Sequence, residues 1–178
     1  MQNVEYLPLT ERALRQIESG AFLTVRAGDA VNVMTIGWAS IGFIWGRPMV
    51  TVLVRRSRYT FELIEQASDF SVSVPLVDMR KELEICGSRS GRTVDKLAKC
   101  RLEVYPGEKI KTPVLNIPGI HFECSIVYKS PLDPALLAAT YQRLYPDKDY
   151  HTMYYGEIAH CFSTETENEK HRLDPVRP

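Results

Sequence analysis

Net charge and long apolar runs are both missing from this sequence of 178 residues. Its 22 lysines and arginines balance 22 aspartates and glutamates, so no overall field draws it to nucleic acid or to an anionic membrane. No apolar run approaches the ~20 residues that cross a bilayer, and the start, MQNVEYLPLTER, lacks the pattern of a signal peptide. We therefore expect a soluble, cytoplasmic protein with no nucleic-acid or membrane partner, in which any basic site is local.

Paired cysteines are missing as well. The four cysteines, Cys86, Cys100, Cys124 and Cys161, include no CxxC pair and no close His–Cys spacing that indicates zinc. We predict no metal site, and we predict reduced, partly buried thiols because disulfides are rare in the cytosol. Cys86 is the candidate for a redox-active thiol, since it lies beside a glycine-rich basic loop.

Several catalytic and nucleotide-binding signatures do not occur. There is no GxGxxG after a strand and no GxxxxGK[ST], so a Rossmann domain and a P-loop both lack support. No Ser–His–Asp or Cys–His arrangement stands out, and we assign no catalytic residue. With 44% apolar residues, no internal repeat and no linker, the chain is expected to form one globular domain. The polar stretch 163–178 is too poor in apolar residues to order itself, and we predict a mobile tail there.

Short β-rich runs separated by turns dominate the sequence and predict a mainly β fold of the β-rich α+β type, a closed or partly closed barrel with peripheral helices. Thr10 and Thr60 are expected to cap helices, with Leu14 and Ile17 facing inward in the first, and Asp133-Pro134 is a good helix start. The predicted strands are 21–27, 31–40, 41–45, 49–55, 70–75, 101–105, 121–129 and 153–162. The predicted helices are 11–18, 61–67, 78–85, 94–99 and 134–144.

The first candidate site is the basic turn 55–60, Arg-Arg-Ser-Arg-Tyr-Thr, between an apolar strand and a helix start. Arginine offers a planar fork that matches phosphate oxygens, and hydroxyl groups and free N–H groups at a helix start add donors. This combination suits a phosphate monoester. A solvated basic turn with an ordinary threonine cap is the alternative.

Two further segments carry weaker signals. The loop 87–92, Gly-Ser-Arg-Ser-Gly-Arg, with Asp95 and Lys96 beyond it, combines tight turns with donors, although a polar surface loop explains it equally well. In the run 32–38, alternation sends Asn32 and Trp38 to one face, where an amide and a large aromatic could frame a flat ring. The alternative is that the tryptophan belongs to the core and the asparagine to a turn.

Taken together, these segments resemble the flavin reductase-like family, and its flavoredoxin branch in particular. The resemblance covers about residues 10–162, and we predict that the domain spans residues 1–162. It rests on NVMTIGWASIGFIWGRPMVTVLVRRSRYTFELIEQASDFSVSVP at 32–75, CGSRSGRTVDK at 86–96, HFECSIV at 121–127 and YYGEIAHCF at 154–162. It implies a split β-barrel of Greek-key type that is dimeric, with FMN held at the interface of a homodimer.

The resemblance also implies a role for each matched position. The strand residues would lie along the flavin ring or its ribityl chain, the two basic segments would hold the phosphate, and two later residues would contact the ring from the other subunit. In that order, the residues are Asn32, Thr35 and Trp38; then Arg55, Ser57, Arg58, Tyr59, Thr60, Ser90, Gly91 and Arg92, with Lys96 at the pyrimidine edge; then His151 and Phe162.

Three functions remain open. The first is a flavin reductase, in which NADH or NADPH reduces the flavin. The second is a flavoredoxin-type carrier that exchanges electrons with a redox protein partner without nicotinamide turnover. The third is a flavin-binding protein without a redox function. The segment 134–145 differs from the family pattern and is expected to shape one wall of the substrate opening.

Overall fold

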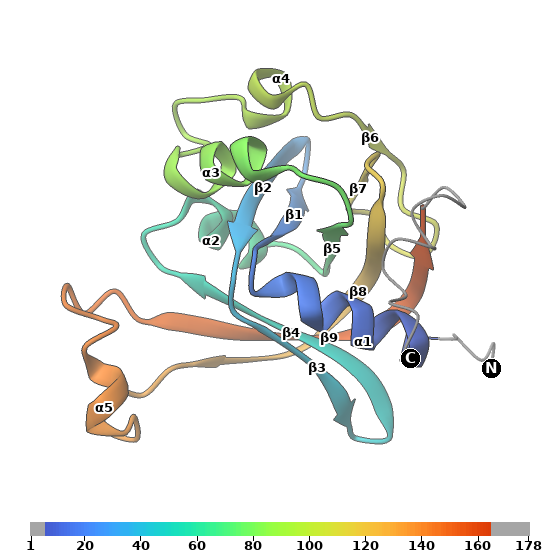
Figure 1. Ribbon diagram of the computed structural model, residues 1–178. Helices are drawn as coiled ribbons and strands as arrows, with labels where there is room; N and C mark the ends of the chain where they lie inside the picture. Colours follow the sequence, from blue (N-terminus) through green and yellow to red (C-terminus); the bar gives the residue numbers. More distant parts are fainter. Residues whose placement is uncertain (1–5, 165–178) are drawn as a thin grey trace, which may run out of the picture.

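The computed structural model describes residues 6–164 as a curved antiparallel sheet with short helices around it (Figure 1). Of the tail predicted over 163–178, all but the first two residues lie outside this part. The helices of the described part are α1 (Tyr6–Ile17), α2 (Tyr59–Ile64), α3 (Arg80–Ser88), α4 (Lys96–Cys100) and α5 (Ala139–Gln142). The strands are β1 (Ala21–Ala27), β2 (Ala30–Ile36), β3 (Ala39–Ile44), β4 (Arg47–Arg55), β5 (Asp69–Pro75), β6 (Val104–Tyr105), β7 (Val114–Leu115), β8 (Gly119–Pro131) and β9 (His151–Ser163).

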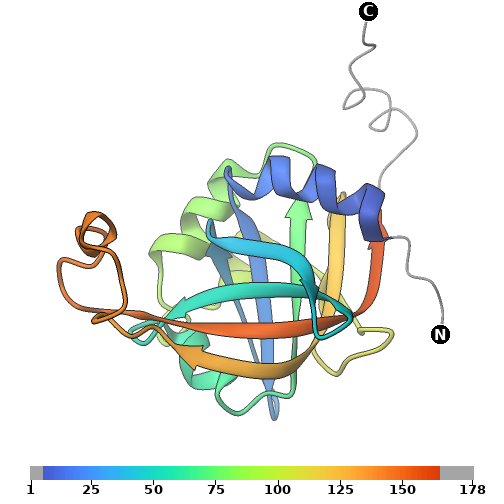
Figure 2. The same ribbon diagram turned by 90° about the horizontal axis from the view of Figure 1, so that it is seen from below.

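Seven strands form one antiparallel sheet in the order β2-β1-β5-β8-β9-β4-β3, and β6 and β7 pair separately. Figure 2 shows the sheet curling around its interior, where Leu23, Val52, Phe70, Phe122 and Tyr154 are fully buried. Helices α3 and α4 pack beside β2 (Figure 1), and α1 packs against β3, β5 and β9. The prediction of a mainly β, α+β fold is confirmed, whereas closure into a split barrel and dimerisation stay predictions. Within residues 6–164, no helix has the length and apolar character needed to span a membrane.

The first helix begins earlier than predicted. Thr10 lies inside α1 rather than at its cap, and Leu14 is 45% exposed, so both predictions were wrong. Ala13 and Ile17, four residues apart, form the buried stripe instead. Gly20, with φ +113°, ends the helix by donating its N–H to the carbonyl of Ile17.

The strand predicted over 31–40 is broken at Gly37 and Trp38. Up to Ile36 the chain pairs with β1, and from Ala39 onward it pairs with β4. The change of partner forces a bend between the two ladders, which residue propensities do not reveal. As a result Trp38 leaves the core face that Met34 and Ile36 occupy and is 41% exposed.

The helix predicted over 134–144 was wrong, because only the four residues of α5 are helical. This segment projects from the body between the ends of β8 and β9 (Figure 2). Leu136 and Tyr141 are exposed, Leu136 to 85%, so these apolar residues have no surface to pack against. A short helix without such packing is marginal in water.

Candidate functional site

The two basic segments lie side by side and touch. The guanidinium group of Arg58 donates to the carbonyl of Gly87, and Nη1 of Arg92 donates to the carbonyl of Ser57 over 3.1 Å. Between them is a pocket of about 140 Å³. Its lining includes hydroxyl and cationic groups from both segments: Ser57, Arg58, Tyr59, Thr60, Ser88, Arg89, Ser90, Gly91, Arg92 and Lys96, together with Met34.

The turn after β4 forms differently from the prediction. Arg58 occupies the N-cap of α2 in an extended conformation, so the assignment of Thr60 as the cap was wrong. Because the helix starts two residues earlier than predicted, Thr60 lies within it and is buried, and its hydroxyl accepts from the amide of Asn32 over 2.7 Å. This bond ties β2 to α2 beneath the pocket.

Gly91 brings the loop 87–92 close to Asn32, which lies beneath the pocket. A Cβ atom at Gly91 would lie 2.1 Å from Oδ1 of Asn32 and 2.7 Å from the ring of Tyr59. Real side chains do not approach so closely, so any larger residue would push the loop away from β2. The glycine therefore fixes the width of the pocket.

Arg58 and Lys96 bring positive charge to the pocket, and neither forms an ion pair within residues 6–164. Burial, followed by the charge of Arg55, lowers the pKa of Arg58, while Asp149 acts in the opposite direction. Burial also lowers the pKa of Lys96 to about 8, and Arg58 adds to this effect. Arg92, which also lines the pocket, is the exception, because it pairs with Glu62. Such a site favours an anionic ligand.

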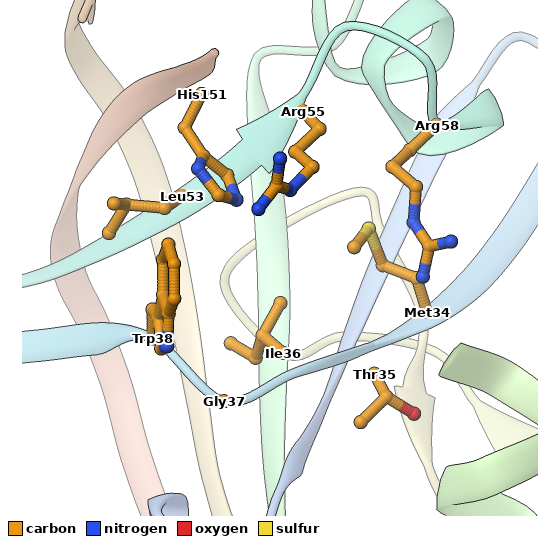
Figure 3. A pocket seen from close by; sticks show the side chains of 9 residues that line it. All are labelled: Met34, Thr35, Ile36, Gly37, Trp38, Leu53, Arg55, Arg58 and His151. Atoms are coloured by element: carbon orange, nitrogen blue, oxygen red, sulfur yellow. The ribbon is translucent and has the colours of Figure 1, made fainter. Parts of the chain in front are cut away.

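A second hollow of about 170 Å³ adjoins the first (Figure 3). Trp38 and His151 contact each other at its wall, with ring centroids 5.0 Å apart, and Cζ of Arg55 lies 5.9 Å from the indole centroid. Met34 and Arg58 line both hollows. The two hollows therefore adjoin, and together they form what we call the groove, from the basic loops to the exposed tryptophan. The lining is completed by Thr35, Ile36, Gly37 and Leu53.

The projecting segment contributes contacts that sequence reasoning missed. Arg55 donates to the carbonyls of Asp149 and Leu144 over 3.0 and 3.1 Å. The carboxylate of Asp149 accepts from the backbone N–H and the hydroxyl of Ser57 over 3.2 and 2.6 Å. Tyr145 lies over Arg55, whose Cζ is 4.9 Å from the ring centroid. No spacing pattern marks these residues, because they belong to an irregular segment 94 positions beyond the turn.

The flavin reductase-like domain model matches residues 15–175. The chain belongs to the flavin reductase-like family. Among curated proteins, an uncharacterised protein of Archaeoglobus fulgidus is 27% identical over 139 residues, which are 78% of this chain and 69% of that protein.

Solved structures of the flavin reductase-like type share the fold. A flavoredoxin from Methanosarcina acetivorans is 30% identical with a TM-score of 0.63, covering 82% of this chain and 68% of that one. An NADH:FAD oxidoreductase from Streptomyces globisporus is 18% identical with a TM-score of 0.61, covering 92% and 87%. At that identity the second likeness concerns the fold alone.

Two predicted ring contacts of this flavin reductase-like chain lie far apart. His151 begins β9 and lines the same hollow as Trp38 of its own chain, although we had predicted it as a contact from a second subunit. Phe162 lies near the other end of β9, stacked between His121 and His160 with centroids 5.0 Å apart in each case. The structure does not bring Phe162 to the groove of its own chain, so its role stays a prediction about a dimer.

The hydroxyl of Thr35 is occupied by a contact with the backbone. Thr35 lines the Trp38 hollow, but its hydroxyl donates to the carbonyl of Leu83 over 2.6 Å.

The four cysteines are free, as predicted. Burial raises the pKa of the Cys86 thiol to about 12, with Cys100 acting in the same direction. A thiol this weakly acidic is protonated at neutral pH, which argues against the redox-active role considered for it.

Proposed function

We propose that this chain binds FMN in the groove and acts as an NAD(P)H-dependent flavin oxidoreductase. The observation that carries the proposal is the cationic pocket. Arg55, Arg58 and Lys96 gather along one groove, and burial of the last two disfavours their charged forms unless an anion arrives. A flavin monophosphate supplies such an anion at one end and a flat ring system at the other.

The donors in the pocket fit a terminal phosphate. Ser88 and Ser90 offer exposed hydroxyl groups, and Arg89 and Arg58 offer guanidinium groups that match phosphate oxygens. Gly91 lets the loop lie against Asn32 and Tyr59, which keeps its backbone beside the pocket. In this proposal Ser57 exchanges its contact with Asp149 for one with the phosphate.

The other hollow fits the flat part of the ligand. Trp38 and His151 present ring surfaces to it, and Ile36 and Leu53 provide apolar walls. Lys96 is almost fully buried with two of its three donors on the carbonyls of Val33 and Cys86, over 3.0 and 2.9 Å. Lys96 lines the basic pocket rather than this hollow, so in this proposal its charge acts at the phosphate end of the ligand.

When bound, FMN supplies the hydride and electron-transfer chemistry, so no protein nucleophile is needed. The residues of this chain hold the ligand, orient it and set the local charge. The match to the flavin reductase-like domain model supports a reductase, for which nicotinamide is the electron donor that we propose.

The second candidate is a flavoredoxin-type carrier that receives electrons from a redox protein. The higher sequence identity to the flavoredoxin of Methanosarcina acetivorans favours this alternative. In that case the opening of the Trp38 hollow would face a protein partner rather than a nicotinamide.

One experiment separates these functions. The protein is purified, its flavin is identified after denaturation, and the flavin-loaded protein is titrated with NADH and NADPH without oxygen. Rapid bleaching of the flavin absorbance supports the reductase. Bleaching only by a reduced ferredoxin-like donor supports the carrier, and inertness to both donors supports flavin binding without a redox function. A protein that neither carries nor takes up flavin contradicts the whole proposal.

We also propose a homodimer in the cytoplasm. Phe43, Trp45, Val127 and Tyr128 expose large apolar surfaces on β8 and the β3–β4 hairpin, and the rings of Trp45 and Tyr128 lie 5.9 Å apart. A monomer rarely exposes such a group of aromatic residues without a partner. A dimer would also allow Phe162 of one chain to approach the groove of the other. Light scattering that finds a flavin-loaded monomer would contradict this.

A further inference from the structure

Tyr145 reaches from the projecting segment to His151. Its hydroxyl lies 2.8 Å from Nδ1 of the imidazole, and both side chains are buried. The contact joins an irregular segment to the first residue of β9. It therefore fixes the orientation of the ring that lines the Trp38 hollow.

The direction of this hydrogen bond follows from counting the hydrogen-bond donors and acceptors of the two side chains. Within residues 6–164, the tyrosine hydroxyl has no other hydrogen-bond acceptor in the structure. If Nδ1 donated, the buried hydroxyl proton would have no partner, which is costly. The arrangement that satisfies both groups has Tyr145 donating to Nδ1, so the neutral imidazole carries its proton on Nε2.

The second ring nitrogen points into the hollow. In Figure 3 it is directed toward Arg55, and the described part of the chain gives it no hydrogen-bond partner. Burial, followed by the charge of Arg55, lowers the pKa of His151 to about 4, so the ring is neutral at pH 7. A neutral ring with Nε2 protonated is a hydrogen-bond donor aimed at whatever occupies the hollow.

We propose that Tyr145 is a positioning residue that holds His151 as an Nε2–H donor to a carbonyl oxygen of the ligand in the Trp38 hollow. The idea rests on the proposed function. The carbonyl belongs either to the flavin ring or to the carboxamide of a nicotinamide placed over it. Both present a neutral oxygen acceptor, which a guanidinium and an Nε2–H group together can hold.

The test compares Tyr145→Phe with Tyr141→Phe, the same change at an exposed tyrosine of the same segment. Removing only the hydroxyl preserves the ring that lies over Arg55 and beside Trp38. Long-range ¹H–¹⁵N correlation spectra of the flavin-free protein report which nitrogen of His151 is protonated. Wild type and Tyr141→Phe are expected to show protonated Nε2 and unprotonated Nδ1, whereas Tyr145→Phe is expected to show a mixture of tautomers.

Binding measurements then identify the carbonyl. If it belongs to the flavin, Tyr145→Phe weakens both FMN and riboflavin by about 3- to 10-fold. If it belongs to the nicotinamide, flavin affinity is unchanged and the KM for NADH rises by a similar factor. In a His151→Phe background, Tyr145→Phe should have no further effect on either quantity, because it acts through the histidine.

The outcomes separate this idea from the proposed function. A wild-type spectrum with protonated Nδ1, or one that Tyr145→Phe leaves unchanged, overturns the positioning role even if the protein binds FMN. Unchanged affinity for flavin and unchanged KM for NADH also overturn it. A protein that binds no flavin refutes the proposed function and the ligand, although the spectra would still report the tautomer.

Discussion

Replacing Arg58 with alanine tests the phosphate pocket through a single side chain. Arg58 lines both hollows and contacts the loop at 87–92 through the carbonyl of Gly87. A hydrogen bond to a charged group contributes about 1.5 to 3 kcal/mol. We therefore expect Arg58→Ala to weaken FMN binding by roughly 10- to 150-fold and riboflavin binding much less, since riboflavin has no phosphate.

The assay is quenching of flavin fluorescence during titration of flavin-free protein with FMN or riboflavin. Arg56→Ala is the matched control, because this neighbouring arginine is exposed and lines neither hollow. Arg58→Lys retains the charge and should recover part of the FMN affinity. Thermal unfolding of each variant checks that losing the contact with Gly87 has not unfolded the protein.

The ratio of the two affinities decides the result. If Arg58→Ala weakens FMN and riboflavin equally, the side chain does not contact the phosphate. If Arg56→Ala reduces FMN affinity as strongly as Arg58→Ala, the effect comes from general charge rather than from the pocket. Either result would refute the reasoning.

Three further changes test neighbouring parts of the groove. Asp149→Asn removes a negative charge beside the anion pocket and should tighten FMN binding by roughly threefold or more, with riboflavin unaffected; weaker FMN binding would contradict this. Because the pKa of Lys96 is about 8, FMN affinity should decline as pH rises above that value and the ammonium is lost, by up to about tenfold per pH unit. Lys96→Met should abolish this decline, and a wild-type profile that is flat across the range would exclude the lysine. Gly91→Ala drives a methyl group into Asn32 and should lower the free energy of unfolding by about 1 to 3 kcal/mol. Gly42→Ala, with open space around the added methyl group, should not lower it. Equal losses for the two variants in chemical denaturation would contradict the close approach of Gly91 to Asn32.

The parts of the fold that sequence predicted are those with local signals. β4 is rich in β-branched residues, β5 alternates valine with serine, and the sequence predicts both with nearly correct bounds. The basic turns were visible because arginine, serine and glycine cluster within a few positions. Their meeting at one pocket depends on the order of strands in the sheet, which only the family resemblance implied.

The missed parts depend on long-range contacts. Trp38 left its expected face because β2 and β3 pair with different strands, and no propensity encodes that change. Tyr145 and Asp149 reach the groove from an irregular segment that resembles a helix in sequence, but in which Leu136 and Tyr141 are exposed and do not pack. Threonine is a common N-cap residue, yet the hydroxyl of Thr60 accepts a hydrogen bond from the buried amide of Asn32 instead.

The most direct measurement is a crystal structure of the protein with FMN. The account predicts the phosphate in the pocket between Arg58 and the loop at 88–92, with the ring in the hollow beside Trp38. A flavin bound elsewhere, or one whose phosphate points to solvent while this pocket holds only water, would contradict it.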